Sequence, residues 1–283
     1  MERKIRFGMV GGSLEGFIGS VHRMAAMLDG QINLVCGAFS SDPLKSKQTG
    51  EHLHLDERRA YSSYQEMIDN EKSLPEDLRM DFVAIVTPNH LHFEQAKLAL
   101  ENGFHVLCEK PLAYSLEQAQ ELEKLVDKTG LLFGLTHNYT GYPMVREARE
   151  IVRKQGIGKI RKVLVEYPQG WLSGRIEENG QKQAAWRTDP TKAGISCCVA
   201  DIGTHAGNLA EYITGLKITE VAADITTFVE GRLLEDDASI LMRFDKDAKG
   251  VMIVSQVATG EENELKIRVY GEKGAIEWLQ SDP

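Results

Sequence analysis

The sequence predicts an α/β domain built on a parallel sheet, followed by an α+β domain with a mainly antiparallel sheet. Over about the first 140 residues, short apolar runs alternate with stretches whose apolar residues recur at helical spacing. From Thr219 onward, successive runs are instead rich in Val, Ile, Thr and Phe, and turn signals such as KDAKG and GEKG separate them. Alternating strands and helices favour parallel βαβ units, whereas successive strands favour antiparallel pairing.

The composition is that of an ordinary globular protein of two domains. The chain has 283 residues, of which 42% are hydrophobic and 27% are charged. This length exceeds that of a typical single domain, so we expect one domain over residues 1–140 and a second over 141–283. The net charge of −9 comes without a block of like charges. A nucleic-acid-binding surface is therefore not expected, and a small polar molecule is the expected partner.

In the first half, each strand and helix is indicated by apolar spacing and by capping residues. The helix after the first strand carries Val21, Met24, Ala25 and Leu28 at the spacing of one face, which we expect to be buried. Asp42, Ser63 and Ser115 stand where helix N-caps are expected. The strands are expected at residues 5–10, 32–39, 81–87, 105–108 and 131–136.

In the second half, a helix is expected from Pro143 and another over residues 199–215, where Gly215 ends the apolar pattern. Residues 170–194 are expected to form a loop. Strands are expected at residues 162–168, 219–229, 238–245, 250–258, 265–271 and 274–280.

The first strand ends in a glycine-rich turn, GMVGGSLEGFIG. Gly11, Ser13 and Gly16 occupy the three positions of a dinucleotide-binding turn, with a serine in place of the middle glycine, and Gly12 lies between the first two. Alone this pattern is weak, because glycine turns are common. Its position at the first strand of a βαβ series favours a site for the pyrophosphate of a dinucleotide, bound at the start of the next helix.

The end of the second strand leaves the choice between NAD and NADP open. An NAD-specific site should carry an acid there for the ribose hydroxyls. The sequence has Ser40 and Ser41 first, and Asp42 is already explained as a helix cap. Because Lys45 and Lys47 follow, a 2′-phosphate could also be accommodated.

Polar residues follow two of the strands directly, at the edge where open α/β sheets bind ligands. Thr87, Pro88 and Asn89 follow one strand, although a turn and a helix start would also explain them. Glu109 and Lys110 follow another, and Pro111 comes next. An acid and a base at this edge are candidates for a binding or catalytic role.

The second half contains two further candidate groups. Asp201 and His205 are four residues apart on a predicted helix, so a carboxylate could orient an imidazole on one helix face. A surface ion pair is the simpler explanation for such a pair, but the flanking residues are small and apolar, which favours a partly buried helix start. Trp186 and Arg187 lie in the long loop and are interpreted either as a packing anchor or as a lid over a polar substrate.

Cysteine usage and apolar run lengths suggest a cytoplasmic protein. The four cysteines lack metal-ligand spacing and are expected to be reduced, mostly buried thiols. The histidines do not cluster except for His90 and His92, so no metal site is expected. No apolar run approaches the roughly 20 residues of a membrane helix.

Taken together, these motifs resemble the Gfo/Idh/MocA family of oxidoreductases. The resemblance covers nearly the whole chain through GMVGGSLEGFIG, TPNHLHFEQAKLAL, HVLCEKPLA and WRTDPTKAGISCCVADIGTH, in that order. It implies a Rossmann domain followed by an open-faced sheet domain that often mediates oligomers. We expect a homo-oligomer formed through this sheet, and a chain that is shorter than most family members. The resemblance also favours a cis peptide at Lys110–Pro111.

The resemblance also assigns roles to individual residues. It implies that Lys110, Asp201 and His205 are catalytic, and that Asn89, His92 and Glu109 lie beside the nicotinamide. The expected activity is hydride transfer between NAD or NADP and a sugar, cyclitol or related polyol. Two alternatives stay open: a lyase or hydrolase that uses transient oxidation, and a non-catalytic dinucleotide-binding regulator.

Overall fold

The computed structural model describes residues 3–282, so residues 1, 2 and 283 of the two predicted domains lie outside it. The chain divides into two compact units, Met1–Thr136 and His137–Pro283. The predicted boundary after residue 140 falls shortly after the first unit ends. Within the described residues, no helix combines the length and the apolar character that crossing a membrane requires.

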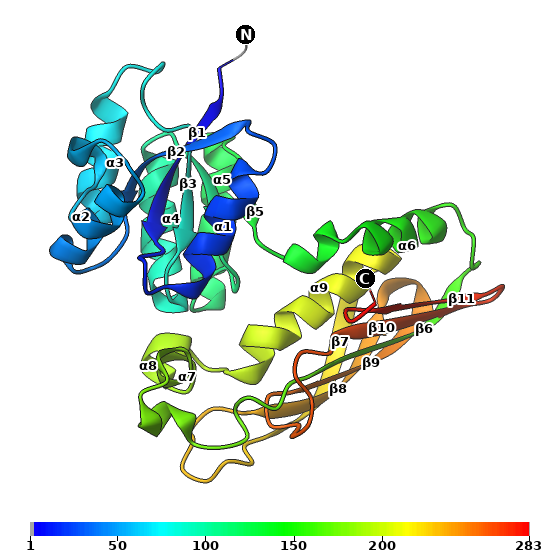
Figure 1. Cartoon of the computed structure of the whole chain (residues 1–283). Helices are drawn as coiled ribbons and strands as arrows, with labels where there is room; N and C mark the ends of the chain where they lie inside the picture. Colours follow the sequence, from blue (N-terminus) through cyan, green and yellow to red (C-terminus); the bar gives the residue numbers. More distant parts are fainter. Residues whose placement is uncertain (1–2, 283) are drawn as a thin grey trace. The chain divides into compact units, whose positions relative to one another are not determined.

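The first unit is a parallel sheet with helices on both faces (Figure 1). The strands lie in the order β2-β1-β3-β4-β5, and every neighbouring pair is parallel. This confirms the predicted α/β class. The strands are β1 (Ile5–Gly11), β2 (Ile32–Ala38), β3 (Phe82–Val86), β4 (His105–Cys108) and β5 (Phe133–Leu135). The helices are α1 (Phe17–Met27), α2 (Pro43–His52), α3 (Tyr64–Ser73), α4 (His92–Glu101) and α5 (Leu116–Thr129).

Two apolar cores hold this sheet between its helices. On one face, side chains of α3, α4 and α5 pack against the strands, with Met67, Phe93, Leu100 and Leu122 among the buried ones. On the other face, Ile18 and Ala26 of α1 are among the side chains that cover a smaller core. Because both faces are covered, the strands are almost entirely apolar, as their sequences indicated.

The capping residues start the helices as the sequence predicts. Asp42 accepts hydrogen bonds from the backbone N–H groups of Leu44 and Lys45. Ser63 accepts from Glu66 N, and Ser115 accepts from Gln118 N. The predicted cis peptide at Lys110–Pro111 is also present.

The strand order places a topological switch between β1 and β3. The connections from these neighbouring strands leave in opposite directions across the sheet, which opens a crevice at their carboxyl ends. Gly11 pairs with Val86, so the glycine turn lies beside Thr87. Ile85 pairs with Cys108, so Glu109 emerges at the same edge. The two groups of polar residues singled out in the sequence therefore share one edge of one sheet.

The predicted buried face of α1 is wrong. Val21, Met24 and Leu28 are 43%, 64% and 82% exposed, whereas Gly19 and Arg23 are buried. The cause is the close approach of α1 to the glycine turn: a Cβ on Gly19 would lie 2.4 Å from Gly12 Cα. Only the face with the smallest residue can approach so closely, and the larger apolar side chains are left outside.

The second unit is a six-stranded sheet with two long helices on one face (Figure 1). The strand order is β11-β10-β6-β9-β8-β7; β6 and β9 are parallel, and the other neighbours are antiparallel. The strands are β6 (Ile160–Pro168), β7 (Ile218–Thr226), β8 (Asp237–Phe244), β9 (Lys249–Ser255), β10 (Lys266–Gly271) and β11 (Ala275–Leu279). The helices are α6 (Pro143–Arg153), α7 (Lys182–Arg187), α8 (Pro190–Ala193) and α9 (Thr204–Thr214).

One face of this sheet is covered by helices, and the other face is open. Buried side chains of α6 and α9, such as Val145 and Leu209, pack on one face. The opposite face leaves Leu241 and Ile253 exposed. The open-faced α+β domain is thus confirmed. The predicted loop 170–194 is only partly correct, because it contains α7 and α8, which are too short to show a helical apolar pattern.

Candidate functional site

The glycine turn after β1 is shaped for close approach of a ligand. Gly11 and Gly12 have φ values of +83° and +73°, which side chains rarely adopt. A Cβ on Gly12 would lie 2.8 Å from Met9 Sδ and 3.0 Å from Gly19 Cα. Ser13 closes the turn by accepting a hydrogen bond from Gly16 N at 2.8 Å through its carbonyl oxygen. The turn therefore depends on small residues at these positions.

The N-terminus of α1 presents backbone N–H groups without a side-chain cap. Gly16 is the N-cap residue, and it has no side chain with which to cap the helix. The first N–H groups of a helix attract anions such as phosphate. Arg23 fixes the turn from below, since its guanidinium is buried and Nη1 donates to Gly12 O at 2.8 Å. These features fit the pyrophosphate of a dinucleotide. Neither Gly19 nor Arg23 belongs to the predicted glycine turn, although both support it.

At the end of β2, Asp42 is the acid nearest to the expected ribose position, and it caps helix α2. Asp42 Oδ1 accepts from Leu44 N at 2.9 Å, and Ser40 Oγ accepts from Asp42 N at 3.1 Å. The Lys45 ammonium lies 3.1 Å from a Glu15 carboxylate oxygen, and both side chains are about half exposed. Ser40 is thus placed at the strand end, as predicted, but within a local turn.

After β3, the predicted cofactor residues form a buried, hydrogen-bonded turn. The Thr87 hydroxyl donates to Gln95 Oε1 at 2.7 Å, and Asn89, which follows Pro88, is 5% exposed. His92 is completely buried, and its ring nitrogens lie 2.8 Å from Pro111 O and from Thr87 O. Its burial lowers the pKa, which these two carbonyl acceptors oppose. His92 therefore links the turn after β3 to the turn after β4.

After β4, the Glu109 carboxylate contacts a histidine from α1. Its Oε1 lies 2.7 Å from His22 Nε2, and the two side chains are 15% and 12% exposed. Burial alone would raise the pKa of Glu109, but the hydrogen bond with His22 and the nearby Thr136 hydroxyl outweigh it and hold the pKa below its ordinary value. Glu109 is therefore ionised, next to the half-buried Lys110. Glu109 and Lys110 were predicted as site residues, whereas His22, which lies in a helix 87 residues away, was not.

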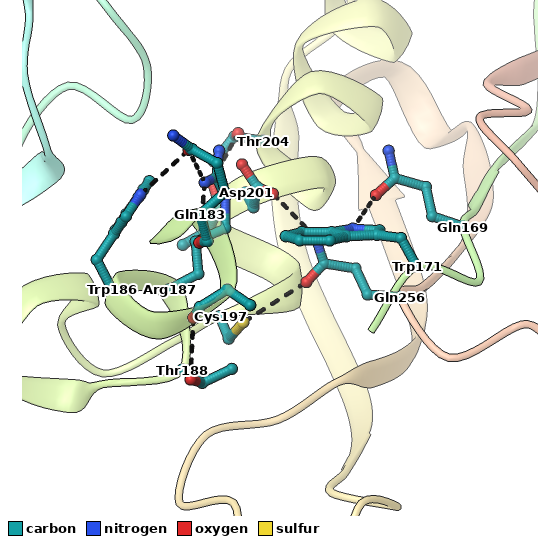
Figure 2. A network of polar contacts seen from close by, with 12 residues as sticks. Gln169, Trp171, Gln183, Trp186, Arg187, Thr188, Cys197, Asp201, Thr204 and Gln256 are labelled. Atoms are coloured by element: carbon teal, nitrogen blue, oxygen red, sulfur yellow. Dashed lines mark hydrogen bonds and ion pairs between the residues drawn. The ribbon is translucent and has the colours of Figure 1, made fainter. Parts of the chain in front are cut away.

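In the second unit, Asp201 is held by two donors. Arg187 Nε lies 3.0 Å from Asp201 Oδ2, and Gln256 Nε2 donates to the same oxygen at 2.9 Å. Cys197 Sγ lies 3.5 Å from Gln256 Oε1, which orients the amide toward Asp201. Gln256 is completely buried. Figure 2 shows this group as sticks.

Two indole rings lie beside Arg187. Its guanidinium carbon is 4.2 Å from the centre of the Trp186 ring and 5.9 Å from that of Trp171 (Figure 2). Arg187 Nη1 also donates to Gln183 Oε1 at 2.7 Å. Cation–π contacts, together with hydrogen bonds to two different acceptors, favour a fixed guanidinium. The predicted pair Trp186 and Arg187 therefore lies at Asp201, and Trp171 and Gln183 join it.

The helix that carries Asp201 and His205 begins with a π-helical turn, Val199–Gly203, before α9. Glu235, which is 7% exposed, caps this start: Oε1 accepts from Ser196 Oγ at 2.6 Å and from Val199 N at 2.9 Å. π-Helical turns are rare in proteins, and those that occur are often found at functional sites. The prediction of a regular helix from residue 199 is corrected here, because sequence spacing cannot distinguish one wide turn from an α-helical turn.

His205 lies in an aromatic cluster and is 7% exposed. Its ring centre is 4.9 Å from that of Tyr139, 5.6 Å from that of His137 and 6.4 Å from that of Tyr167. The Tyr139 and Tyr167 hydroxyls are hydrogen-bonded, and Tyr167 donates to Asn263 Oδ1 at 2.7 Å. Burial raises the pKa of both tyrosines, so they stay neutral. This cluster fixes the imidazole plane.

All four cysteines are free and buried, as expected. Burial raises the pKa of Cys197 to about 12, so its thiol keeps its proton beside Gln256. Over residues 3–282, no group of three or more His, Cys, Asp or Glu side chains suits a metal ion.

Two family models match this chain in consecutive stretches. Residues 5–137 match an oxidoreductase family with an NAD-binding Rossmann fold, and residues 145–277 match the GFO/IDH/MocA C-terminal domain.

Individual proteins of known structure or activity are similar over almost the whole chain. An oxidoreductase from Sinorhizobium meliloti is 47% identical with a TM-score of 0.88, and the match covers 100% of this chain and 74% of that one. An inositol dehydrogenase homolog from Azotobacter vinelandii, solved with NADH and myo-inositol, is 34% identical with a TM-score of 0.91 over 99% and 72% of the two chains. Levoglucosan dehydrogenase from Pseudarthrobacter phenanthrenivorans is 25% identical over 97% of this chain and 73% of its own.

Proposed function

Because the chain belongs to the Gfo/Idh/MocA family of oxidoreductases, with an NAD-binding Rossmann domain, we propose that it transfers hydride between a nicotinamide and a CH–OH group of a sugar, cyclitol or related polyol. The relative solved with NADH and myo-inositol supports this substrate class. The observation that carries the proposal is the position of Glu109 and Lys110. They follow β4 at the sheet edge where β1 and β3 open the crevice.

The residues of the first unit fit a dinucleotide. The glycine turn from Gly11 through Gly12 and Ser13 to Gly16 would hold the pyrophosphate together with the N-terminus of α1, and Ser40 would lie toward the ribose. The turn after β3, Thr87–Pro88–Asn89, would lie against the nicotinamide with Glu109 and Lys110. His92 would support that turn from below. When bound, the nicotinamide supplies the hydride acceptor.

The polar residues of the second unit would bind the substrate and move its proton. His205 would take the hydroxyl proton as general base, since its imidazole is held in a fixed plane. Asp201, fixed by Arg187 and Gln256, would accept a hydrogen bond from a substrate hydroxyl and help to orient His205. Trp186 and Arg187 would form the wall of the sugar site.

The proposed role of Lys110, in the first unit, is to stabilise the alkoxide that develops when a polyol is oxidised. A fixed ammonium is most effective where water is excluded. The hydroxyl proton would pass to His205, and the hydride would pass to the nicotinamide from the carbon that bears this hydroxyl, which leaves a carbonyl group. Negative charge develops on the oxygen as its proton leaves, and this is the atom that Lys110 would contact.

The test is a panel of sugars, inositols and other polyols, each assayed with NAD and with NADP. We expect NADH or NADPH absorbance to accumulate with at least one polyol. A product formed without net reduction of the cofactor would instead support a lyase or hydrolase. Tight NADH binding without turnover of any polyol would support a dinucleotide-binding regulator. Which cofactor gives the higher kcat/KM decides between NAD and NADP.

We also propose that the open face of the second sheet joins copies of this chain into a homo-oligomer. On this face Leu241 of β8 pairs across the strands with Ala222 of β7 and with Val251 of β9, and it is 57% exposed. Ile253 of β9, which pairs with Ser239 and therefore lies on the same face as Leu241, is 42% exposed. An apolar sheet face of this kind usually marks an interface. Two copies of the chain could bury this sheet face against each other, because an isologous interface uses the same surface of both subunits.

A hollow of about 770 Å³ lies on the same unit, and its lining does not include Asp201 or His205. Ile253, Phe228 and Thr259 are among its lining residues. Since Ile253 belongs to the open face, the hollow fits better with the proposed interface than with the substrate.

A further inference from the structure

His22 connects the helix of the glycine turn to the strand end that carries Lys110. It lies in the middle of α1 (Phe17–Met27), on the same helix whose N-terminus follows the glycine turn. Its Nε2 is 2.7 Å from Glu109 Oε1, and neither side chain is more than 15% exposed. Hydrogen bonds of this length to a carboxylate are strong when water is largely excluded.

The Glu109 carboxylate is engaged on both oxygens. Oε1 accepts from His22, and Oε2 lies 3.3 Å from Lys110 N. The Thr136 hydroxyl, which follows β5, lies next to this carboxylate and donates to the backbone oxygen of Cys108 at 3.2 Å. Donors from helix α1 and from the strand end therefore fix one carboxylate, which contacts the backbone of Lys110.

Helix α1 does not depend on His22 for its docking. Gly19 already lies against the glycine turn, and the buried Arg23 donates to Gly12 O at 2.8 Å. These contacts hold the helix one turn before His22 and at the residue after it. We therefore attribute the contact between His22 and Glu109 to the placement of Glu109 rather than to the docking of the helix.

We infer that His22 is a positioning residue: its hydrogen bond fixes Glu109 and, through Glu109, the backbone from which Lys110 extends. This inference rests on the proposed function for the role of Lys110. His22 would thus affect the rate of the reaction without contacting the reacting atoms. Loss of the bond would leave a nearly buried carboxylate without its principal donor, and the strand end would then adopt other conformations.

A double-mutant cycle tests the inference. The variants are His22→Leu, Glu109→Gln and the two together, and His52→Leu, an exposed histidine on α2, is the matched control. We expect each single change to lower kcat for polyol oxidation by roughly 10- to 100-fold, since small misplacements of a reacting group have effects of this size. The double variant should be no worse than the poorer single variant. His22→Gln, which can still donate, should regain most of kcat.

Effects of His22→Leu and Glu109→Gln that multiply in the double variant would overturn the inference, as would a normal kcat in His22→Leu. If His22→Leu does not fold, the comparison of His22→Gln with Glu109→Gln replaces it: wild-type kcat in the first and a lowered kcat in the second support the inference, and a lowered kcat in both contradicts it.

A second measurement does not need turnover. The ¹⁵N-histidine NMR spectrum of the whole chain should show a shifted ring resonance for His22 in Glu109→Gln, assigned by its loss in His22→Gln. An unchanged His22 resonance would overturn the contact itself. If the wild type oxidises no polyol, the proposed function fails while this spectrum still decides whether His22 and Glu109 are coupled.

Discussion

Arg187 and Asp201 form an ion pair in which the guanidinium Nε lies 3.0 Å from carboxylate Oδ2, at 20% and 13% side-chain exposure. Trp186 lies against the same guanidinium, and Gln256 donates to the same carboxylate oxygen. Oδ2 is thus occupied by protein donors. These contacts fix the plane of the carboxylate that we propose to contact a substrate hydroxyl.

Replacing Arg187 by Lys should weaken substrate binding. Lysine keeps the charge but loses the planar set of donors that reaches Asp201 and Gln183 together. We expect kcat/KM for the best polyol to fall by roughly 10-fold or more, the value of a hydrogen bond to a charged group, with NADH affinity unchanged. The control is Arg175→Lys, an exposed arginine paired with Glu178. Equal kcat/KM in the two variants would contradict the assigned role.

Replacing Gly19 by Ala should disrupt dinucleotide binding, although Gly19 is outside the glycine fingerprint. The added Cβ would lie 2.4 Å from Gly12 Cα, so the turn or the helix must move. We expect NADH to bind at least roughly 10-fold more weakly in a fluorescence titration, because the N–H groups of the turn are displaced. Gly141→Ala serves as the control, since its Cβ meets nothing within 4 Å. Unchanged NADH affinity in Gly19→Ala would rule out the proposed cradle.

The ionised state of Glu109 predicts a pH dependence of stability. Its pKa in the folded chain lies below the ordinary value of 4.5, so the folded state binds its proton more weakly than the unfolded state does. The resulting stabilisation is fully present above pH 4.5 and is lost as the pH falls through the folded pKa. The difference in unfolding free energy between wild type and Glu109→Gln should therefore shrink on acidification. Urea unfolding of both proteins at several pH values measures this difference. A difference that grows toward acid pH would contradict the prediction.

The proposed sheet interface predicts an effect of one charge on the assembly. Leu241→Asp places a carboxylate on the open face, where burial without a partner is costly. We expect light scattering to give a multiple of 31.6 kDa for the wild type and a lower mass for this variant. Leu116→Asp, at a leucine of α5 that is 68% exposed, should leave the mass unchanged. A wild type that is monomeric at all concentrations would contradict the interface.

The order of the elements and the sheet edge of the candidate site were predictable because they rest on local signals. Apolar periodicity gave the strands and helices, and Ser63 and Ser115 marked helix starts that the structure shows. Parallel strands have their carboxyl ends at one edge, so the residues after β1, β3 and β4 had to lie together.

The partners of the site residues were not predictable, because they come from distant parts of the chain. His22 and Glu109 are separated by 87 residues, and Gln256 and Asp201 by 55. The wrong face for α1 has a similar origin: helical spacing identifies an apolar stripe, but the close approach at Gly19 decides which stripe is buried. A signal was nevertheless present, since a glycine in the middle of a helix usually has a packing reason.

The most direct test of the central claim is to measure both kcat and the Kd for NADH in Lys110→Met. Methionine keeps the length and removes the charge, and Lys124→Met, an exposed lysine on α5, is the matched control. If Lys110 stabilises the alkoxide, kcat for the best polyol should fall by roughly 10²- to 10³-fold while the Kd for NADH changes little. Near-normal turnover in Lys110→Met would contradict the proposed chemistry.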